Sequence, residues 1–185
     1  LPELEPEEQP ERFAELCRTI DRIEPTAENV PARLAALLCP LGEAGARKAL
    51  RKLKCSNALT DEVTALEREA PGTPGSEMQL TAKRLLGRYE LQTIQRLTAL
   101  CSARHPEQTR AFAALRAEAE QLTAENACCR VSQLAVNGRD LMAAGVRPGP
   151  GLRQVLNALL ETVITGQTPN EKDALLAAAA QFSAS

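Results

Sequence analysis

The chain has 185 residues, a formal net charge of −2 at pH 7, 44% apolar residues and only 2% aromatic ones. A chain of this length can bury a substantial core, which Leu and Ala must supply, and no run approaches the roughly 20 apolar residues of a membrane span. The composition therefore excludes a membrane-spanning segment, and the acidic start resembles no signal peptide, so a cytoplasmic protein is expected.

Apolar residues recur at helical spacing along nearly the whole chain, with interruptions at Pro, Gly and Asn. They predict helices over residues 10–23, 30–39, 43–54, 59–69, 77–88, 90–103, 106–125, 149–165 and 170–182. No segment shows the two-residue alternation that marks a strand. The expected fold is all-α, an irregular multi-helix array.

The helix expected over residues 43–54 separates apolar from basic side chains. Ala46, Ala49, Leu50 and Leu53 fall on its inward face, whereas its cations lie mainly outward. These cations are Arg47, Lys48, Arg51 and Lys54. They form a basic patch that is either an ordinary solvated surface or a contact for an acidic partner.

Turn-forming residues mark the ends of several helices. The Pro/Gly/Ser stretch at 71–76 is the first joint along the chain, and Ser76 stands at N-cap and capping-box spacing before the following helix. Gly166 is expected to end the helix that precedes it, and Thr168 or Asn170 to cap the next one.

Groups that carry catalysis or bind metals are sparse. The single histidine, His105, adjoins Pro106 and is interpreted as a surface or capping residue. The six cysteines form no CxxC pair, so we expect free thiols and no metal site. Phosphate-loop, serine-nucleophile and zinc-peptidase motifs do not occur. The residues themselves predict no catalytic site.

Residues 134–151, LAVNGRDLMAAGVRPGPG, concentrate four glycines and two prolines. We expect a tight turn at Asn137-Gly138, a one-turn helix capped by Asp140, and a helix end at Gly145. Four cations surround this corner, where Asp140 is the only nearby acid: Arg130, Arg139, Arg147 and Arg153. The spacing fits either a helix corner with solvated arginines or a corner that binds an anion, with help from main-chain N–H groups at the next helix start.

The order of residues in 134–179 resembles the tail region of bacterial CCA-adding enzymes, the tRNA nucleotidyltransferases. The resemblance is carried by Gly138, Asp140 and Leu141; Gly145, Pro148 and Gly149; Leu156 and Leu159; Val163 and Gly166; and Asn170, Leu175 and Leu176. Three earlier stretches, 32–38, 50–57 and 82–100, resemble the body helices of that family. The resemblance implies neck and body helices at 1–71, body helices at 72–127 and a tRNA-binding tail at 128–185.

The parent enzyme that this resemblance implies is a CCA tRNA nucleotidyltransferase, which adds C, C and A to tRNA 3′ ends from CTP and ATP with Mg²⁺. Its polymerase head has no counterpart in these residues, so the chain, which opens on Leu1, is expected to be an inactive C-terminal fragment without cofactors of its own. Relatives with a phosphohydrolase-like His-Asp pair have LLHD where this chain has LLCP at 37–40, so the metal ligands of a phosphatase are missing.

The function that follows from the resemblance is tRNA docking, with the 3′ end presented to the head of the same polypeptide and no membrane involved. The expected RNA-binding residues are Arg130, Arg139, Arg147, Arg153, Gly138 and Gly149, with Arg47, Lys48, Arg51 and Lys54 as a second contact. The only rings are Phe13, Tyr89, Phe112 and Phe182, so backbone contacts should outweigh base stacking. The alternatives are an all-helical protein-interaction or homodimerisation domain that binds no RNA, and a remnant of a His-Asp phosphohydrolase.

Overall fold

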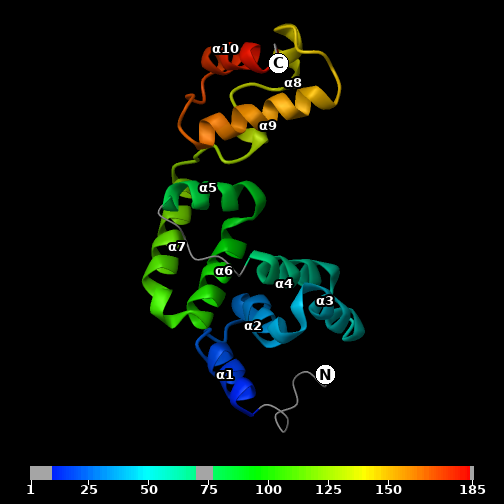
Figure 1. The fold of residues 1–185 in the computed structure, drawn as a ribbon, viewed down its shortest axis with the longest axis vertical. Helices are drawn as coiled ribbons and strands as arrows, with labels where there is room; N and C mark the ends of the chain where they lie inside the picture. The colour runs from blue at the N-terminus through cyan, green and yellow to red at the C-terminus, as the bar shows by residue number, and fades with distance from the viewer. Residues whose placement is uncertain (1–9, 70–76, 184–185) are drawn as a thin grey trace. The chain divides into compact units, whose positions relative to one another are not determined.

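The computed structural model describes residues 10–69 and 77–183, which contain helices and no strand (Figure 1). The expected all-α multi-helix array is confirmed. The α-helices are α1 (Pro10–Asp21), α2 (Val30–Leu38), α3 (Gly42–Lys52), α4 (Asn57–Glu69), α5 (Met78–Arg88), α6 (Leu91–Arg104), α7 (Thr109–Ala124), α8 (Gly138–Ala143), α9 (Pro150–Ile164) and α10 (Lys172–Ser183). Short 3₁₀ turns are η2 (Ala27–Asn29), η3 (Cys39–Leu41), η4 (Pro106–Gln108) and η5 (Val131–Gln133).

Contacts divide the chain into two compact units, each built from two stretches of sequence. Unit 1 comprises residues 1–76 and 90–117, and unit 2 comprises residues 77–89 and 118–185. Helix α7 contributes to both units. The three segments expected from the sequence, 1–71, 72–127 and 128–185, were defined by resemblance to a family, whereas these units are defined by contacts within the structure. The three segments therefore remain a prediction.

Unit 1 is built around α2, which packs against α1, α3, α4 and α6. Ala32, Ala35 and Ala36 of α2 are buried, and their small side chains allow the neighbouring helices to approach closely. Thr60 and Thr64 of α4 are buried too, and each hydroxyl donates to the main-chain carbonyl oxygen four residues earlier. Burial of these hydroxyls is therefore compensated within α4 itself.

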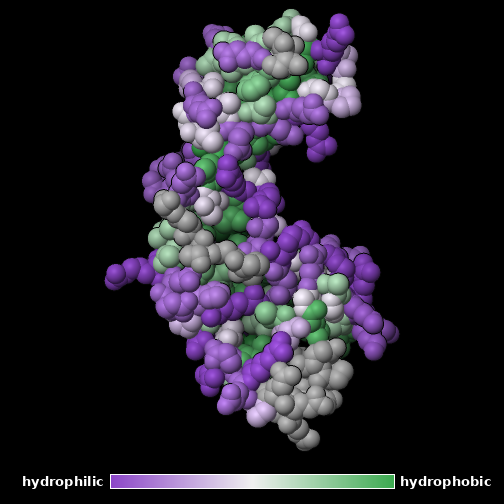
Figure 2. Space-filling view, in the orientation of Figure 1, coloured by the Kyte–Doolittle hydropathy of each residue, from purple (hydrophilic) through white to green (hydrophobic). Residues whose placement is uncertain are grey.

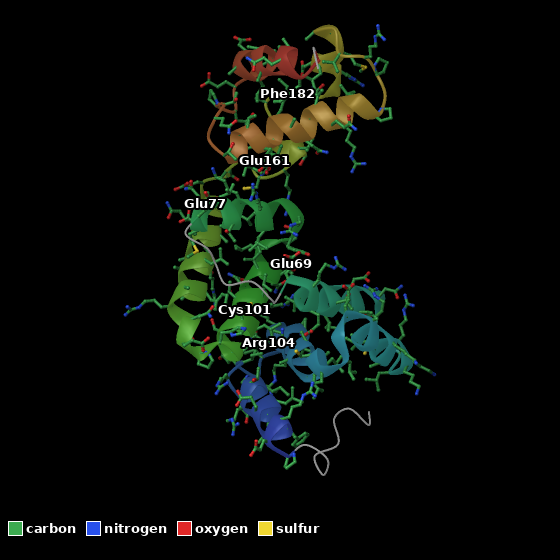
Figure 3. The ribbon with its side chains drawn as sticks, viewed as in Figure 1. Glu69, Glu77, Cys101, Arg104, Glu161 and Phe182 are labelled. Atoms are coloured by element: carbon green, nitrogen blue, oxygen red, sulfur yellow. The ribbon has the colours of Figure 1, made fainter. Side chains whose placement is uncertain are left out.

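A buried ion pair joins α6 to the rest of the unit 1 core. Arg104 is the last residue of α6 (Figure 3). Its Nη2 lies 2.7 Å from Glu67 Oε1 of α4, and the Glu67 side chain is only 6% exposed. The same guanidinium donates to the carbonyl oxygen of Ala35 in α2. Because a buried charge is costly without a partner, this pair fixes α6 against both helices. Arg96 of α6 and Glu62 of α4 form a second, slightly more exposed pair.

Unit 2 closes around α8, α9, α10 and the segment that precedes α8. Its buried apolar side chains are Val136, Leu141, Val155, Leu159, Leu175 and Ala179. Helix α5 packs on α9, where Arg84 pairs with Glu161 and Lys83 Nζ donates to the carbonyl oxygen of Ile164. The Lys83 ammonium thus meets the C-terminal end of α9, where the helix dipole favours a cation.

Two glycines end helices where the sequence predicts it. Gly145 follows α8 with φ +98°, and Gly166 follows α9 with φ +75°, both in the left-handed region that favours glycine. The N–H of the residue after each glycine donates to the carbonyl oxygen five residues earlier. These bonds pair carbonyl groups that the last turn of each helix would otherwise leave free.

Several expected details differ in the structure. Leu53, expected to face inward, follows the end of α3 and is 69% exposed. Helix α10 begins at Lys172, so neither Thr168 nor Asn170 is its cap. The predicted cap Ser76 lies outside the described residues. Helix ends are the least reliable part of a periodicity argument, since the last turn adds few core contacts.

Gly87 lies within α5, where a distant part of the main chain passes too close for a side chain. A Cβ at Gly87 would lie 2.8 Å from the carbonyl oxygen of Cys129, a distance that real Cβ atoms essentially never show. Gly151 of α9 is the contrast, because a Cβ there would meet no atom within 4 Å. Helix propensity favours alanine at both positions, but sterics oppose it at Gly87 alone.

We therefore predict opposite effects of alanine at these two glycines. Gly87→Ala should lower the free energy of unfolding by about 1–3 kcal/mol, because the segment around Cys129 must move away from α5. Gly151→Ala should leave stability unchanged or raise it by up to ~1 kcal/mol. Urea denaturation followed by circular dichroism measures both, and equal effects of the two substitutions would contradict the close approach at Gly87.

Candidate nucleic-acid interface

The first turn of α8 is closed by reciprocal hydrogen bonds between Asn137 and Asp140. Asn137 Oδ1 accepts from the main-chain N–H of Arg139 (2.8 Å) and of Asp140 (3.3 Å), and Asp140 Oδ2 accepts from the N–H of Asn137 (2.9 Å). This arrangement is a capping box. The predicted turn at Asn137-Gly138 followed by an Asp140 cap is wrong, since Asn137 is the N-cap and Gly138 is the first helical residue.

Asp140 also pairs with Lys172 at the start of α10. Lys172 Nζ lies 2.6 Å from Asp140 Oδ1. The hydrogen bond from Lys172 lowers the pKa of Asp140 and that from the Asn137 N–H lowers it further, while the bond to Asp140 raises the pKa of Lys172. The only carboxylate of residues 128–160 is therefore neutralised by a cation from another helix.

Three arginines of unit 2 lie on consecutive parts of the corner between α8 and α9. Arg139 lies on α8, Arg147 in the loop after it, and Arg153 near the start of α9. All three are exposed, and none forms an ion pair or side-chain hydrogen bond within the described residues. Figure 2 shows hydrophilic residues bordering the more apolar centre of this unit. We call these three residues the arginine corner.

The main chain brings the two ends of the arginine corner together. A Cβ on Gly138 would lie 3.2 Å from Leu152 Cδ2, so the start of α8 packs on the start of α9. Arg139 and Arg153 directly follow these two residues in the chain. Gly149, with φ +135°, has a conformation that other residues rarely adopt. The two glycines predicted to bind RNA thus shape the corner; their contact with RNA remains a prediction.

Arg130 has different surroundings from the arginine corner. Its Nε donates to the carbonyl oxygen of Leu86 (2.9 Å) and its Nη2 to that of Tyr89 (3.0 Å), at the C-terminal end of α5. These bonds pair carbonyl groups that the helix leaves unsatisfied, and a cation is favoured at that end. Arg130 therefore holds the segment before α8 against α5, and a role in RNA binding remains a prediction.

Two side-chain amides whose role here the sequence did not predict hold the same segment. Gln133 Oε1 accepts from the N–H groups of Cys129 and Arg130, both at 2.9 Å. Asn170 Oδ1 accepts from the N–H of Ala135 (2.8 Å), and its Nδ2 donates to the carbonyl oxygen of Gln133 (3.0 Å). The partners of Asn170 are more than 30 residues away, so no local pattern could have revealed them.

The basic patch of α3 belongs to unit 1 and is only partly available to a ligand. Arg47 donates to Asp61 Oδ1 (2.9 Å) and to Thr64 Oγ1 (2.8 Å), and so joins α3 to α4. The other three cations are exposed and have no ion-pair partner in the described part of the chain: Lys48, Arg51 and Lys54. The contact of this patch with RNA remains a prediction.

Side chains with metal-binding or catalytic chemistry are dispersed. Within residues 10–69 and 77–183, no three His, Cys, Asp or Glu side chains form a group that could hold a metal ion. His105 stands at the C-terminal end of α6, and its ring centre lies 6.5 Å from that of Phe112, so the expected capping position is confirmed. None of the helices in the described ranges is long and apolar enough to cross a membrane.

Known proteins match this sequence over most of its length. The family model for tRNA nucleotidyltransferase domain 2 matches residues 26–179. The CCA-adding enzyme of Lactiplantibacillus plantarum is 32% identical over 155 residues, which cover 82% of this chain and 36% of that enzyme. The CCA-adding enzyme of Geobacillus kaustophilus is 30% identical over 152 residues, which cover 77% of this chain and 34% of that enzyme.

A shorter region is more similar to a further relative. The CCA-adding enzyme of Levilactobacillus brevis is 62% identical over 45 residues, which are 24% of this chain and 11% of that enzyme. The chain spans about a third or less of the length of these relatives. No solved structure gives a significant match.

The Asp140–Lys172 pair predicts a specific dependence of unit 2 stability on pH. Because the pKa of Asp140 is lowered in the folded state from 3.8, the pair stabilises the fold above that pH and loses its effect as pH falls through the lowered pKa. Asp140→Asn should lower the melting temperature at pH 7, and the difference from the unmodified chain should shrink towards pH 3.

A double-mutant cycle provides the control. Lys172→Gln should have a similar effect at pH 7, and the double variant should be no less stable than the worse of the two single variants. Calorimetric melting curves at pH 7 and pH 3 measure these differences. Additive effects of the two substitutions, or a difference that is constant with pH, would contradict the pairing.

Proposed function

Since this chain belongs to the tRNA nucleotidyltransferase family, we propose that unit 2 docks tRNA on the arginine corner between α8 and α9. The observation that carries the proposal is the set of three exposed guanidinium groups without an acidic partner in the described residues, next to an aspartate already neutralised by Lys172. Phosphate groups of an RNA backbone are the anions that such a surface attracts.

The corner has properties that suit recognition of shape more than of base sequence. Arginine forms bidentate hydrogen bonds with phosphate oxygens, and these contacts set orientation without reading a base. Structured RNA is bound largely through its contour and backbone. The packing of Gly138 on Leu152 and the positive φ of Gly149 define the path of the main chain that carries these arginines from α8 to α9.

Exposed cations on α3 and just after its end are the second proposed RNA contact. Lys48, Arg51 and Lys54 carry it, whereas Arg47 is engaged with α4 and contributes mainly to the fold of unit 1. Arg130 of unit 2 likewise contributes mainly to the fold. We therefore expect substitution of an exposed cation to weaken tRNA binding more than substitution of Arg47 or Arg130, although each substitution removes one positive charge.

The proposed parent activity is the addition of CCA to the 3′ end of tRNA. The names of the relatives state CCA addition for those enzymes. The described residues offer no cluster of metal ligands, so no metal step is assigned to this chain. We propose that CTP, ATP and Mg²⁺ bind to a polymerase head of the parent enzyme. The docked tRNA would present its 3′ end to that head. The proposal places the protein in the cytoplasm.

The salt dependence of tRNA binding tests this function. The three phosphate contacts of the arginine corner should contribute about −3 to the slope of log K against log salt, because each neutralised phosphate releases about 0.9 counterion. Arg139→Ala combined with Arg153→Ala should flatten the slope by about 2 and weaken binding at 50 mM salt. Fluorescence anisotropy with a labelled tRNA transcript between 50 and 200 mM salt measures both quantities.

Arg110→Ala is the matched control, since Arg110 is an exposed arginine of α7 without a partner in the described residues. It should leave the affinity and the slope unchanged. Equal affinity and slope for the double variant and the unmodified chain would refute docking at the arginine corner. Absence of tRNA binding together with self-association in sedimentation would favour the alternative of a dimerisation domain.

A further inference from the structure

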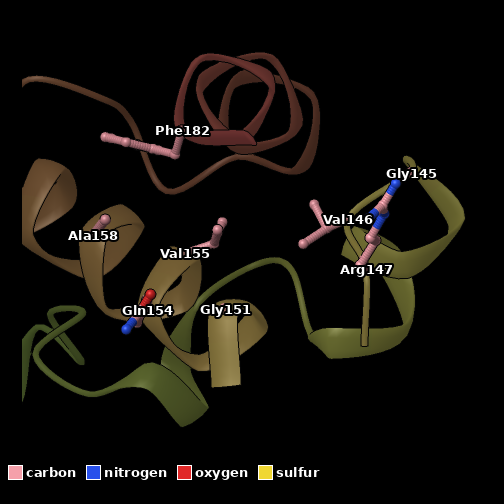
Figure 4. A pocket seen from close by; sticks show the side chains of 8 residues that line it. All are labelled: Gly145, Val146, Arg147, Gly151, Gln154, Val155, Ala158 and Phe182. Atoms are coloured by element: carbon pink, nitrogen blue, oxygen red, sulfur yellow. The ribbon is translucent and has the colours of Figure 1, made fainter. Parts of the chain in front are cut away.

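Unit 2 contains a cavity of about 560 Å³ beside the arginine corner. Its walls come from the loop after α8, from one face of α9 and from the end of α10 (Figure 4). The lining residues that matter below are Arg147, Gln154, Val155, Ala158 and Phe182. Cavities of 300–1,000 Å³ with mixed apolar and polar walls are typical of sites for small organic groups.

Phe182 stands apart from the other aromatic residues of the described chain. Its side chain is 40% exposed, whereas Phe112 is 2% exposed and Phe13 and Tyr89 are half-buried. Figure 4 shows Phe182 reaching from α10 over the part of α9 that carries Ala158, with Arg147 across the cavity. An aromatic ring that keeps an exposed face at a cavity is available for stacking.

The cavity also offers polar groups at its open side. Gln154 has an amide that both donates and accepts hydrogen bonds. Gly145 and Gly151 line the cavity, and a Cβ at either would meet no atom within 4 Å, so the main chain there is accessible. Arg147 lies at the rim without an ion-pair partner in the described residues.

We propose that this cavity takes one unpaired nucleobase of a bound RNA, stacked on Phe182 and hydrogen-bonded by Gln154, with a neighbouring phosphate on Arg147. This proposal rests on the RNA docking proposed above and adds a contact to it. An RNA nucleotide fits because flat apolar, amide and cationic groups meet in one place, and because Asp140 is neutralised by Lys172, so that an anion at the corner meets little opposing charge. The sequence expectation that stacking is nearly absent would then hold for every ring but this one.

Stacking and phosphate contacts differ in their salt dependence, which provides the test. Phe182→Leu keeps an apolar side chain but removes the ring, and should weaken binding of a hairpin RNA with one bulged nucleotide by about five- to tenfold. The salt slope should not change, because stacking releases no counterions. Phe182→Tyr, which keeps the ring, should bind like the unmodified chain.

The same hairpin without the bulge is the matched probe, and for it Phe182→Leu should change the affinity less than twofold. Met142→Leu, at another exposed apolar residue of unit 2, should affect neither hairpin. Melting curves of all variants identify any loss of folding. If Phe182→Leu is unstable, Gln154→Ala at an exposed position of the same cavity decides the question, because it should weaken binding of the bulged hairpin and leave that of the unbulged hairpin unchanged.

Equal loss of affinity for both hairpins, or none for either, would overturn the nucleobase site. If Arg139→Ala with Arg153→Ala still flattens the salt slope in that case, tRNA docking stands and only the cavity assignment fails. If the unmodified chain binds neither tRNA nor hairpin, the proposed function fails and the cavity assignment with it.

Discussion

The ion pair between Asp140 and Lys172 is the interaction on which the electrostatics of unit 2 depend. Asp140 is the only carboxylate between residues 128 and 160, and it lies next to Arg139 in the chain. Its two oxygens accept from the Asn137 N–H and from Lys172 Nζ, so the first turn of α8 and the start of α10 are held by the same group. A carboxylate fixed in this way is not available to neutralise the arginine corner. Stability of the unit and its positive surface therefore have one structural origin.

The arginines of unit 2 and of α3 fall into two classes according to what surrounds them. Arg130 and Arg47 donate to oxygens of neighbouring helices and hold the fold together. The arginine corner has no such partners within the described residues. A buried or paired guanidinium has already exchanged its water for protein oxygens, and releasing it to a phosphate would leave those oxygens unpaired. Exposed guanidinium groups carry no such penalty, which is why the proposed site is narrower than the set of arginines expected from the sequence.

Periodicity predicted the existence and type of every long helix because the core faces repeat at 3.6 residues, as in Ala46, Ala49 and Leu50 of α3. The helix ends at Gly145 and Gly166 were also predictable, since positive φ follows a local rule.

Contacts between distant segments could not be predicted from the sequence. Gly87 is explained only by the passage of Cys129, and Asn170, expected as a cap, bonds to a segment far away in sequence. The predicted inward position of Leu53 was wrong for a local reason, because α3 ends one residue before it. Which arginines are free likewise depends on such distant partners.

The RNA contacts proposed for unit 2 rest on two physical interactions that have different ranges. The arginine corner acts over about a Debye length and is weakened by salt, so it guides and orients a polyanion without distinguishing one base from another. A ring at a cavity acts only in contact and needs a base that is not paired. Helix α9 joins the two sites, because its Leu152 packs on Gly138 at the start of α8 while its Val155 and Ala158 line the cavity. An RNA held by the corner would thus present only those unpaired bases that its own fold places within reach of Phe182, which makes the contour of the RNA the source of selectivity.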